Sequence, residues 1–275
     1  MSESKTKVKT GNLSRRAVLR LTAAAVATAA SGVSWARPGQ QATRGKAATA
    51  PNAIPLVTKV IKTTNGRVQG LVNNGIHTFK GIRYGAAPVG ALRWMPPQKP
   101  EAWKTVLDCS SYGAPAMQIA SGTIAAPVSD FGMQMGRVFT TPSDLKIQNE
   151  DCLFLNVWTP GADSQKRPVM VWIHGGGFAF GSAGQPIYEG EDLAREQDVV
   201  VVSMNHRLNL FGYLHLGDLM GEGYQSSGTV GMQDLVLCLE WIRDNIAEFG
   251  GDPANVMIMG QSGGGAKVSI LLSMP

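Results

Sequence analysis

The chain has 275 residues, of which 44% are hydrophobic and 16% are charged, and such ordinary globular values exclude disorder throughout the chain. This length allows one large α/β domain or two small ones. The formal net charge of +5 belongs to residues 1–36, which carry six basic residues and one acidic residue (Lys5, Lys7, Lys9, Arg15, Arg16, Arg20; Glu3). Because the rest of the chain is electrically balanced, we expect no nucleic-acid-binding face on it.

The N-terminal segment has the pattern of an export signal. A twin arginine, Arg15-Arg16, precedes the alanine-rich segment 21–33, and small residues follow at Ser34-Trp35-Ala36 with the spacing that a signal peptidase reads. The apolar segment is too short to span a bilayer, so we expect no stable membrane anchor. Residues 1–36 resemble a bacterial twin-arginine signal peptide, which implies that the export machinery and a signal peptidase are partners and that the location is periplasmic or extracellular.

Two further regions follow the export signal. Residues 37–55 are rich in alanine, glutamine, threonine and proline, and we expect them to form a disordered tail. Residues 56–275 are expected to form the folded part. The three cysteines, Cys109, Cys152 and Cys238, permit at most one disulfide, and their spacing indicates no metal site. We expect Cys238 to be a buried small hydrophobe and expect no cofactor.

The first folded residues predict an antiparallel meander. Short strands are expected at 57–61, 66–72 and 76–82, with asparagine-glycine turn signals at 65–66 and 74–75. A proline-rich stretch, residues 84–100, is then expected to be a long loop.

The middle and end of the chain alternate between strand and helix patterns. A continuous apolar run indicates a buried strand, whereas apolar residues at helical spacing indicate an amphipathic helix. We expect strands at 151–158, 168–173, 199–204 and 256–259, the last of them fully buried, and helices at 193–197, 231–249 and 266–273. This order predicts a parallel crossover architecture.

The pattern Gly-x-Ser-x-Gly occurs at residues 260–264, directly after the last predicted strand. This pattern is typical of a sharp strand-to-helix turn that holds a serine hydroxyl, here that of Ser262, clear of the sheet. Glycine is needed two residues either side because larger side chains would collide with the neighbouring strand and helix. Taken alone, the five residues also fit an ordinary strand–turn–helix.

A second motif, His174-Gly175-Gly176-Gly177-Phe178, follows the strand predicted at 168–173. Consecutive glycines let the backbone approach a substrate closely and turn its amide hydrogens inward, as in the oxyanion holes of lipases and esterases. A glycine run alone is a flexible turn in most proteins. Its place after a buried strand and upstream of Ser262 favours the oxyanion hole.

Together these segments resemble the N-terminal half of a type B carboxylesterase, a family of α/β-hydrolases. The resemblance rests on segments that occur in the family's order: 81–85, 93–97, 150–157, 175–178, 205–207, 241–246 and 249–253. It implies an incomplete α/β-hydrolase fold with a central, mostly parallel sheet and the N-terminal antiparallel meander. It also implies a serine esterase that acts on small-molecule carboxylic esters through an acyl-enzyme.

The resemblance assigns roles to particular residues. It makes Ser262 the nucleophile and the backbone amides of Gly176, Gly177 and Gly263 the oxyanion hole. Gln261 stands where the family usually has glutamate, so a local negative charge is missing. The cation-binding tryptophan of cholinesterases has no counterpart within 131–149, which disfavours choline esters.

The same resemblance indicates what is absent. In many relatives a disulfide joins the cysteine at position 152 to an upstream cysteine; the nearest one here is Cys109, and we favour free thiols. All four histidines precede Ser262, and none can be assigned as the base (His77, His174, His206, His215). We expect a structural hydrogen bond at His174 and satisfied or surface side chains for the other three.

We therefore expect a truncated fragment that lacks the triad acid and histidine, with the strand at 256–259 left as an open apolar edge. The alternatives are a non-catalytic α/β-hydrolase-like binding protein and a non-functional gene fragment.

Overall fold

The computed structural model describes residues 56–118 and 147–274, all within one compact unit of the chain. The predicted signal peptide (1–36) and the predicted tail (37–55) lie outside the described residues. Among the residues that are described, no helix has both the length and the apolar character needed to cross a membrane.

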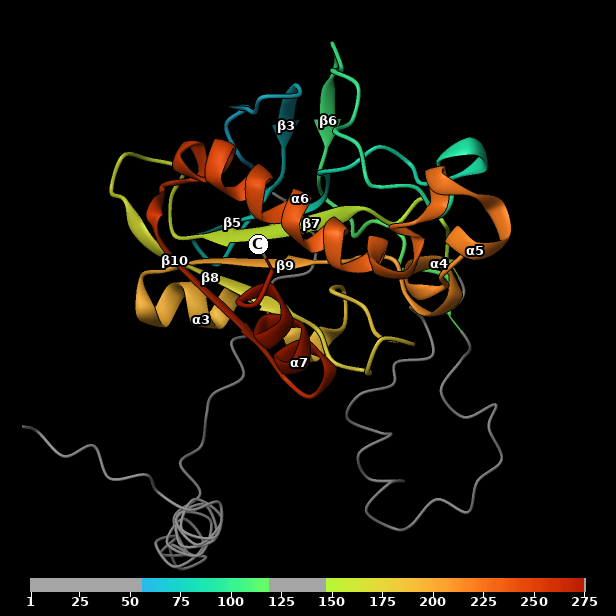
Figure 1. Ribbon diagram of the computed structural model, residues 1–275. Helices are drawn as coiled ribbons and strands as arrows, with labels where there is room; N and C mark the ends of the chain where they lie inside the picture. Colours follow the sequence, from blue (N-terminus) through green and yellow to red (C-terminus); the bar gives the residue numbers. More distant parts are fainter. Residues whose placement is uncertain (1–55, 119–146, 275) are drawn as a thin grey trace, which may run out of the picture. The chain divides into compact units, whose positions relative to one another are not determined.

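A seven-stranded sheet forms the centre of the described structure, in the order β1-β4-β5-β7-β9-β8-β10 (Figure 1). These strands are β1 (Leu56–Val57), β4 (Leu71–Asn73), β5 (Ile76–Arg83), β7 (Phe154–Thr159), β9 (Val200–Met204), β8 (Arg167–Ile173) and β10 (Gly251–Gly260). A smaller sheet of three strands contains β2 (Ile61–Lys62), β3 (Arg67–Gln69) and β6 (Val106–Asp108).

The large sheet is mixed, which corrects the expectation of a mostly parallel one. Every pairing from β1 through to β9 is antiparallel, and only the pairings of β9 with β8 and of β8 with β10 are parallel. The reason lies in the link between β7 and β8, which consists only of residues 160–166. A parallel connection needs a crossover of about a dozen residues or more, so β8 has to run opposite to β7.

The predicted meander is confirmed with two differences, of which the first is that the strand expected at 57–61 is two short strands, β1 and β2, in different sheets. Asn74 and Gly75 both have positive φ, 47° and 82°, as a two-residue hairpin turn between β4 and β5 requires. The single strand expected at 66–72 is instead two strands that belong to different sheets. They separate at Gly70, where an added Cβ would lie 2.1 Å from the carbonyl oxygen of Thr78 on β5. This close approach admits only glycine, and it marks the point where the chain passes between the sheets.

Helices cover both faces of the large sheet. The long helix α6 (Val230–Asn245) lies over one face and α3 (Glu191–Gln197) lies over the other (Figure 1). A 3₁₀ turn, η6 (Ile246–Phe249), continues α6 until Gly250, whose φ of 81° ends it. Shorter helices are α4 (Asn209–Tyr213), α5 (Gly217–Met220) and the 3₁₀ turns η1 (Gly90–Leu92), η3 (Pro186–Tyr188), η4 (Glu222–Tyr224) and η5 (Ser227–Thr229). The last helix is α7 (Gly263–Leu271).

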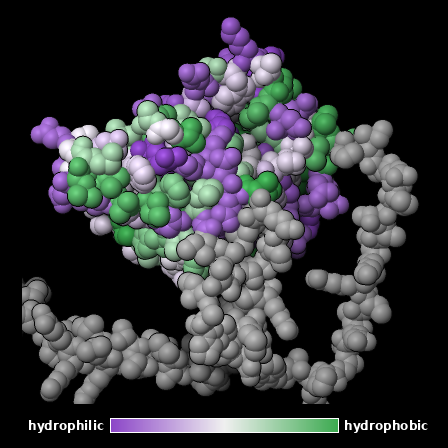
Figure 2. Space-filling model, turned by 90° about the vertical axis from the view of Figure 1, so that its right-hand side faces the viewer, coloured by the Kyte–Doolittle hydropathy of each residue, from purple (hydrophilic) through white to green (hydrophobic). Residues whose placement is uncertain are grey.

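The strand β10 is less buried than its sequence predicts. We expected residues 256–259 to be fully buried, but Met257 is 50% exposed because β10 pairs with β8 alone and forms the edge of the described sheet. The open apolar edge that we expected is therefore present among the described strands. A different face, shown in Figure 2, carries hydrophobic patches among hydrophilic ones.

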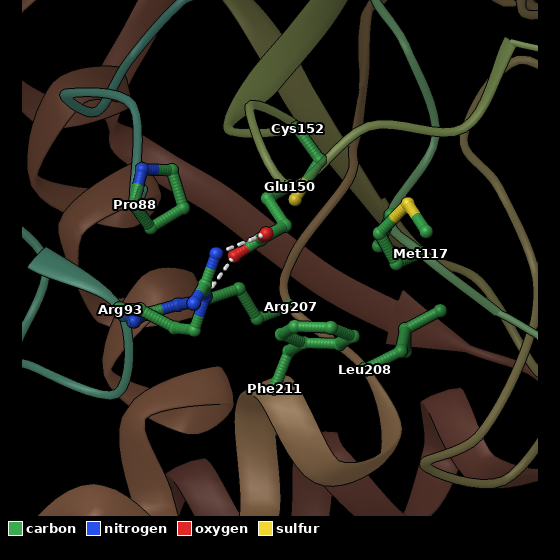
Figure 3. A pocket seen from close by; sticks show the side chains of 9 residues that line it. Pro88, Arg93, Met117, Glu150, Cys152, Arg207, Leu208 and Phe211 are labelled. Carbon is green, nitrogen blue, oxygen red and sulfur yellow. Dashed lines mark hydrogen bonds and ion pairs between the residues drawn. The ribbon is translucent and has the colours of Figure 1, made fainter. Parts of the chain in front are cut away.

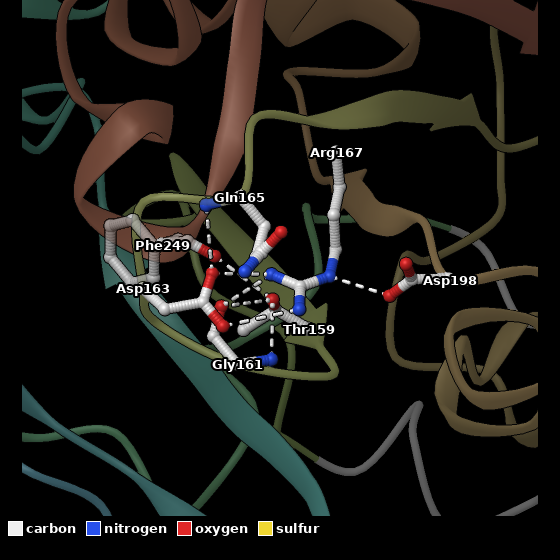
Figure 4. A network of polar contacts seen from close by, with 7 residues as sticks. All are labelled: Thr159, Gly161, Asp163, Gln165, Arg167, Asp198 and Phe249. Atoms are coloured by element: carbon white, nitrogen blue, oxygen red, sulfur yellow. Dashed lines mark hydrogen bonds and ion pairs between the residues drawn. The ribbon is translucent and has the colours of Figure 1, made fainter.

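A polar network fastens the end of the parallel strands that lies opposite the predicted nucleophile (Figure 4). Arg167, at the start of β8, donates to Asp163 at 2.7 Å and to Asp198 at 2.6 Å. Its backbone amide donates to the carbonyl of Gly250, just before β10. These contacts fix the positions at which β8 and β10 begin.

Candidate active site

Ser262 lies at the sharp turn between β10 and α7, where the sequence places the nucleophile. Its backbone has φ 56° and ψ −123°, a conformation that is strained for a residue with a side chain. Ser262 is exposed, and among the described residues its hydroxyl has no hydrogen-bond partner. Within the part of the chain that the structure describes, the turn thus presents an exposed hydroxyl without a hydrogen-bond partner.

The two glycines that flank this turn are required by contacts with backbone. A Cβ added at Gly264 would lie 2.1 Å from the carbonyl oxygen of Ile173, the last residue of β8. A Cβ added at Gly260 would lie 2.5 Å from the carbonyl carbon of Gly264. Larger residues would push α7 away from the end of β8, so the predicted reason for glycine at both positions agrees with the geometry.

The glycine loop follows β8 and lies directly against the nucleophile turn. Gly176 and Gly177 have φ values of 92° and 62°, which favour glycine. The carbonyl of Gly176 accepts hydrogen bonds from the amides of Ala179 and Phe180, both at 3.2 Å. A Cβ added at Gly263 would lie 2.4 Å from the Cα of Gly177. The structure therefore brings together Gly177 and Gly263, and Gly176 directly precedes Gly177 in the chain.

Polar side chains hold the glycine loop from both ends. His174 is buried, and its Nδ1 lies 2.8 Å from the carbonyl of Gly175, which confirms the predicted structural hydrogen bond. Beyond the loop, Gln118 exchanges two hydrogen bonds with the backbone of Gly181, at 2.8 and 2.9 Å. Asn205 accepts a hydrogen bond from the amide of Ala183 at 2.8 Å.

Lys267, a buried residue of α7, also contacts the loop, which was not predicted from the sequence. Its Nζ donates to the carbonyl of Gly177 at 2.6 Å and lies 4.9 Å from the centre of the Phe178 ring. Burial lowers the pKa of this lysine to about 8. One signal could have found it, namely a single lysine in the otherwise apolar segment 266–273.

The expectation of a satisfied or surface side chain is wrong for His206. This residue is buried, its ring packs on His174 with 4.7 Å between ring centres, and neither ring nitrogen has a partner among the described residues. Burial lowers the pKa of both histidines, that of His174 to about 4, and the nearby Lys267 lowers them further. His215 is at the surface as predicted, with its Nε2 3.7 Å from Asp218. In the described part of the chain, no histidine is hydrogen-bonded to Ser262.

Ion pairs join several segments on which the family resemblance rests. In the pocket shown in Figure 3, Arg93 donates to Glu150 at 2.6 Å, beside Cys152. That pocket has a cavity volume of about 10 Å³, room for roughly one water molecule. Deeper in the structure, Arg207 forms a bidentate pair with Asp234 of α6, at 2.7 and 2.9 Å.

The three cysteines are free and buried, which confirms the preference for free thiols. Burial raises the pKa of the Cys109 thiol to about 12 and also raises the pKa of the Cys152 and Cys238 thiols. No group of three metal-ligating side chains occurs within residues 56–118 and 147–274.

A mixed sheet whose parallel strands lead to a strained serine turn, with a glycine loop packed against it, defines an α/β-hydrolase. Comparison with known proteins identifies the family. A model of the carboxylesterase family matches residues 57–275, and the chain belongs to that family.

Individual relatives agree with this assignment. The para-nitrobenzyl esterase of Bacillus subtilis (strain 168) is 41% identical over 217 residues, which are 79% of this chain and 41% of that protein. The liver carboxylesterase of Sus scrofa is 39% identical over 232 residues, 80% of this chain and 38% of that protein. A solved carboxylesterase from Geobacillus stearothermophilus is 44% identical with a TM-score of 0.69, covering 79% of this chain and 40% of the other. The chain thus spans about two fifths of the length of these relatives.

Proposed function

We propose that the full-length gene product carrying this chain hydrolyses carboxylic esters through an acyl-enzyme on Ser262. The observation that carries the proposal is the strained, exposed Ser262, which stands between Gly260 and Gly264, at both of which an added Cβ would collide with backbone atoms. A fold that keeps a serine in an unfavourable conformation has to stabilise it elsewhere, and such strain clusters at active sites. The relatives named above are esterases, and their names support the same reaction class.

In the proposed reaction, the Ser262 oxygen attacks the ester carbonyl, and the alcohol leaves with the serine's proton. Water then releases the acid and restores the hydroxyl. The backbone amides of Gly176, Gly177 and Gly263 stabilise the oxyanion, and losing one such donor costs about 100- to 1,000-fold in rate. The contact between Gly177 and Gly263 supports this role, since it brings two of the three amides to the same place.

The proposed base is a histidine outside this chain. His174 and His206 are buried, with pKa values lowered by burial and by Lys267, and neither is hydrogen-bonded to Ser262. A serine hydroxyl without a base is a poor nucleophile at neutral pH. We therefore expect negligible turnover from the 275-residue chain alone. Hydrolysis that survives in this chain and disappears in Ser262→Ala would contradict the external base.

A fluorophosphonate probe tests the nucleophile directly. The full-length protein is expected to be labelled on Ser262 and to lose the label in Ser262→Ala. The matched control is Ser269→Ala, because Ser269 is an exposed serine of the same helix whose hydroxyl bonds to the carbonyl of Gly265. A full-length protein that takes up no label at Ser262 would favour the alternatives, a non-catalytic binding protein or a non-functional gene product.

We also propose export by the twin-arginine route. The support is the Arg15-Arg16 pair before an alanine-rich segment and the small residues that end at Ala36. Replacing both arginines by lysine keeps the charge but removes the pair, so the shortened, exported form should disappear. Unchanged export of the lysine variant would refute the route.

A further inference from the structure

Lys267 is a buried charge next to the proposed oxyanion hole, and its burial needs a reason. It lies on α7, five residues after Ser262 in the sequence, and is 0% exposed. Burying an ammonium group costs free energy, so natural proteins rarely bury a lysine that has no partner. Here the partner is a backbone carbonyl of the glycine loop, 2.6 Å from Nζ.

The loop needs such a partner at Gly177. The φ of 62° at this residue lies in the left-handed region, which favours glycine, and a Cβ there would meet nothing within 4 Å. Packing on that side of Gly177 therefore does not fix its conformation. Its neighbour Gly176 is fixed differently, because its carbonyl accepts hydrogen bonds from the amides of Ala179 and Phe180 in a turn. In the described structure, the only hydrogen bond to the carbonyl of Gly177 comes from Lys267.

We propose that Lys267 is a positioning residue, which fixes Gly177 and thereby aims the oxyanion-hole amides at the reacting carbonyl above Ser262. This inference rests on the proposed ester hydrolysis. The geometry is apt because α7 begins directly after Ser262, so one rigid helix carries both the nucleophile and the anchor of the glycine loop. A fixed distance between nucleophile and oxyanion donors is what preorganised catalysis requires.

The charge of Lys267 strengthens the anchor. Its neighbours among the titratable groups are His174, after β8, and His206, after β9, and both are neutral near pH 7 because their pKa values are lowered. Burial lowers the pKa of Lys267 to about 8, so the hydrogen bond to Gly177 is charge-assisted below that pH and weaker above it. The turnover number should therefore fall as the pH rises through about 8.

The lysine should at the same time lower stability. Its pKa is lower in the folded than in the unfolded state, so the unfolded state binds more protons between about pH 8 and the ordinary lysine value. The cost of the buried charge is thus fully present below about pH 8 and disappears as the pH rises above it. Removing the charge is expected to leave stability unchanged or raise it, whereas removing a merely structural group would lower it.

The experiment compares Lys267→Met with Lys62→Met in the full-length protein. Methionine has nearly the length of lysine without the donor, and Lys62 is exposed on β2. For Lys267→Met we expect kcat and the rate of fluorophosphonate labelling to fall about 10- to 100-fold, less than for complete loss of a donor. KM should stay within about twofold, because the interaction acts in the transition state. Lys62→Met should behave as the parent protein does.

A second variant makes the test independent of how well Lys267→Met folds. Lys267→Ala removes the atoms that propylamine can replace, so added propylamine should restore activity several-fold, whereas the bulkier tert-butylamine should not. The pH profile of the parent protein should show the fall in kcat near pH 8, and both variants should lack it.

The outcomes are distinguishable. An unchanged kcat in Lys267→Met overturns the positioning role while leaving the proposed esterase intact. A loss of kcat that accompanies a matching loss of stability, without amine rescue, also overturns it, because it shows a structural role. Failure of the parent protein itself to take up the probe overturns the proposed function, and the role of Lys267 falls with it.

Discussion

Replacing Gly264 by alanine should disable the nucleophile turn, and its neighbour Gly265 provides a matched control on the same helix. A Cβ at Gly264 would lie 2.1 Å from the carbonyl oxygen of Ile173, whereas ordinary van der Waals contact begins at 3.4 Å. The obstacle is the backbone of a paired strand, so the first turn of α7 has to move by more than 1 Å. At Gly265 the nearest atom, the carbonyl oxygen of Gly260, would be 3.3 Å away.

The two variants should differ in both activity and stability. A displacement of about 1 Å at a catalytic group costs on the order of 100-fold in rate, and overpacking costs about 1–3 kcal/mol of stability. Alanine is a better helix former than glycine by about 1 kcal/mol, so Gly265→Ala should be neutral or slightly stabilising. Only Gly264→Ala should lose reactivity.

The assay is the rate of fluorophosphonate labelling at Ser262, measured beside thermal unfolding of each full-length variant. Wild-type labelling by Gly264→Ala would refute the reasoning, because it would mean that β8 does not constrain the turn. Equal losses in both variants would refute it as well, since Gly265 faces no such obstacle.

Other residues give further predictions. Asp234→Asn should lower the free energy of unfolding by about 3–5 kcal/mol, because it leaves Arg207 buried without its counter-charge. The double variant Arg207→Met/Asp234→Leu should recover most of this loss, as measured by denaturant unfolding. A single variant as stable as the parent protein would contradict the prediction. The pKa of His206 is lowered, so its contribution to stability is present above about pH 6.5 and is lost as the pH falls. His206→Phe should therefore stabilise the folded protein more at about pH 5 than at about pH 8. An equal effect on the free energy of unfolding at both pH values would refute this. A thiol reagent should modify no cysteine in the native protein and all three after denaturation. Fewer than three modified cysteines in the denatured protein would reveal a disulfide.

The sequence predicted those parts of the fold that have a local cause. The hairpin at Asn74-Gly75 follows from two residues that tolerate positive φ, and the end of η6, the 3₁₀ turn that continues α6, follows from Gly250. The share of antiparallel pairings was not predicted, although the short link at residues 160–166 requires β8 to run opposite to β7. The split at Gly70 depends on a close approach to β5 that no local pattern reveals. The exposure of β10 likewise depends on its place at the sheet edge, not on its apolar residues.

The candidate site shows the same division. The turn at Ser262 and its glycines were predicted because a sharp strand-to-helix turn and close backbone approach restrict the residue types within a short motif. Lys267 was missed because its partner, Gly177, lies far away in the sequence, and only the packing of α7 against the loop brings them together. His206 was wrongly expected to be satisfied, because hydrogen-bond partners of a buried side chain cannot be counted from sequence.

The place of β9 has a consequence for how the chain folds during synthesis. This strand lies between β7 and β8, although both are made before it. When residue 173 leaves the ribosome, β7 already has β5 as a neighbour, but β8 has no partner on either side until β9 and β10 are made. Unpaired edges of this kind promote aggregation. Insertion of the buried, valine-rich β9 therefore gives β7 and β8 a shared partner, and slow synthesis just before residue 200 should raise the risk of misfolding.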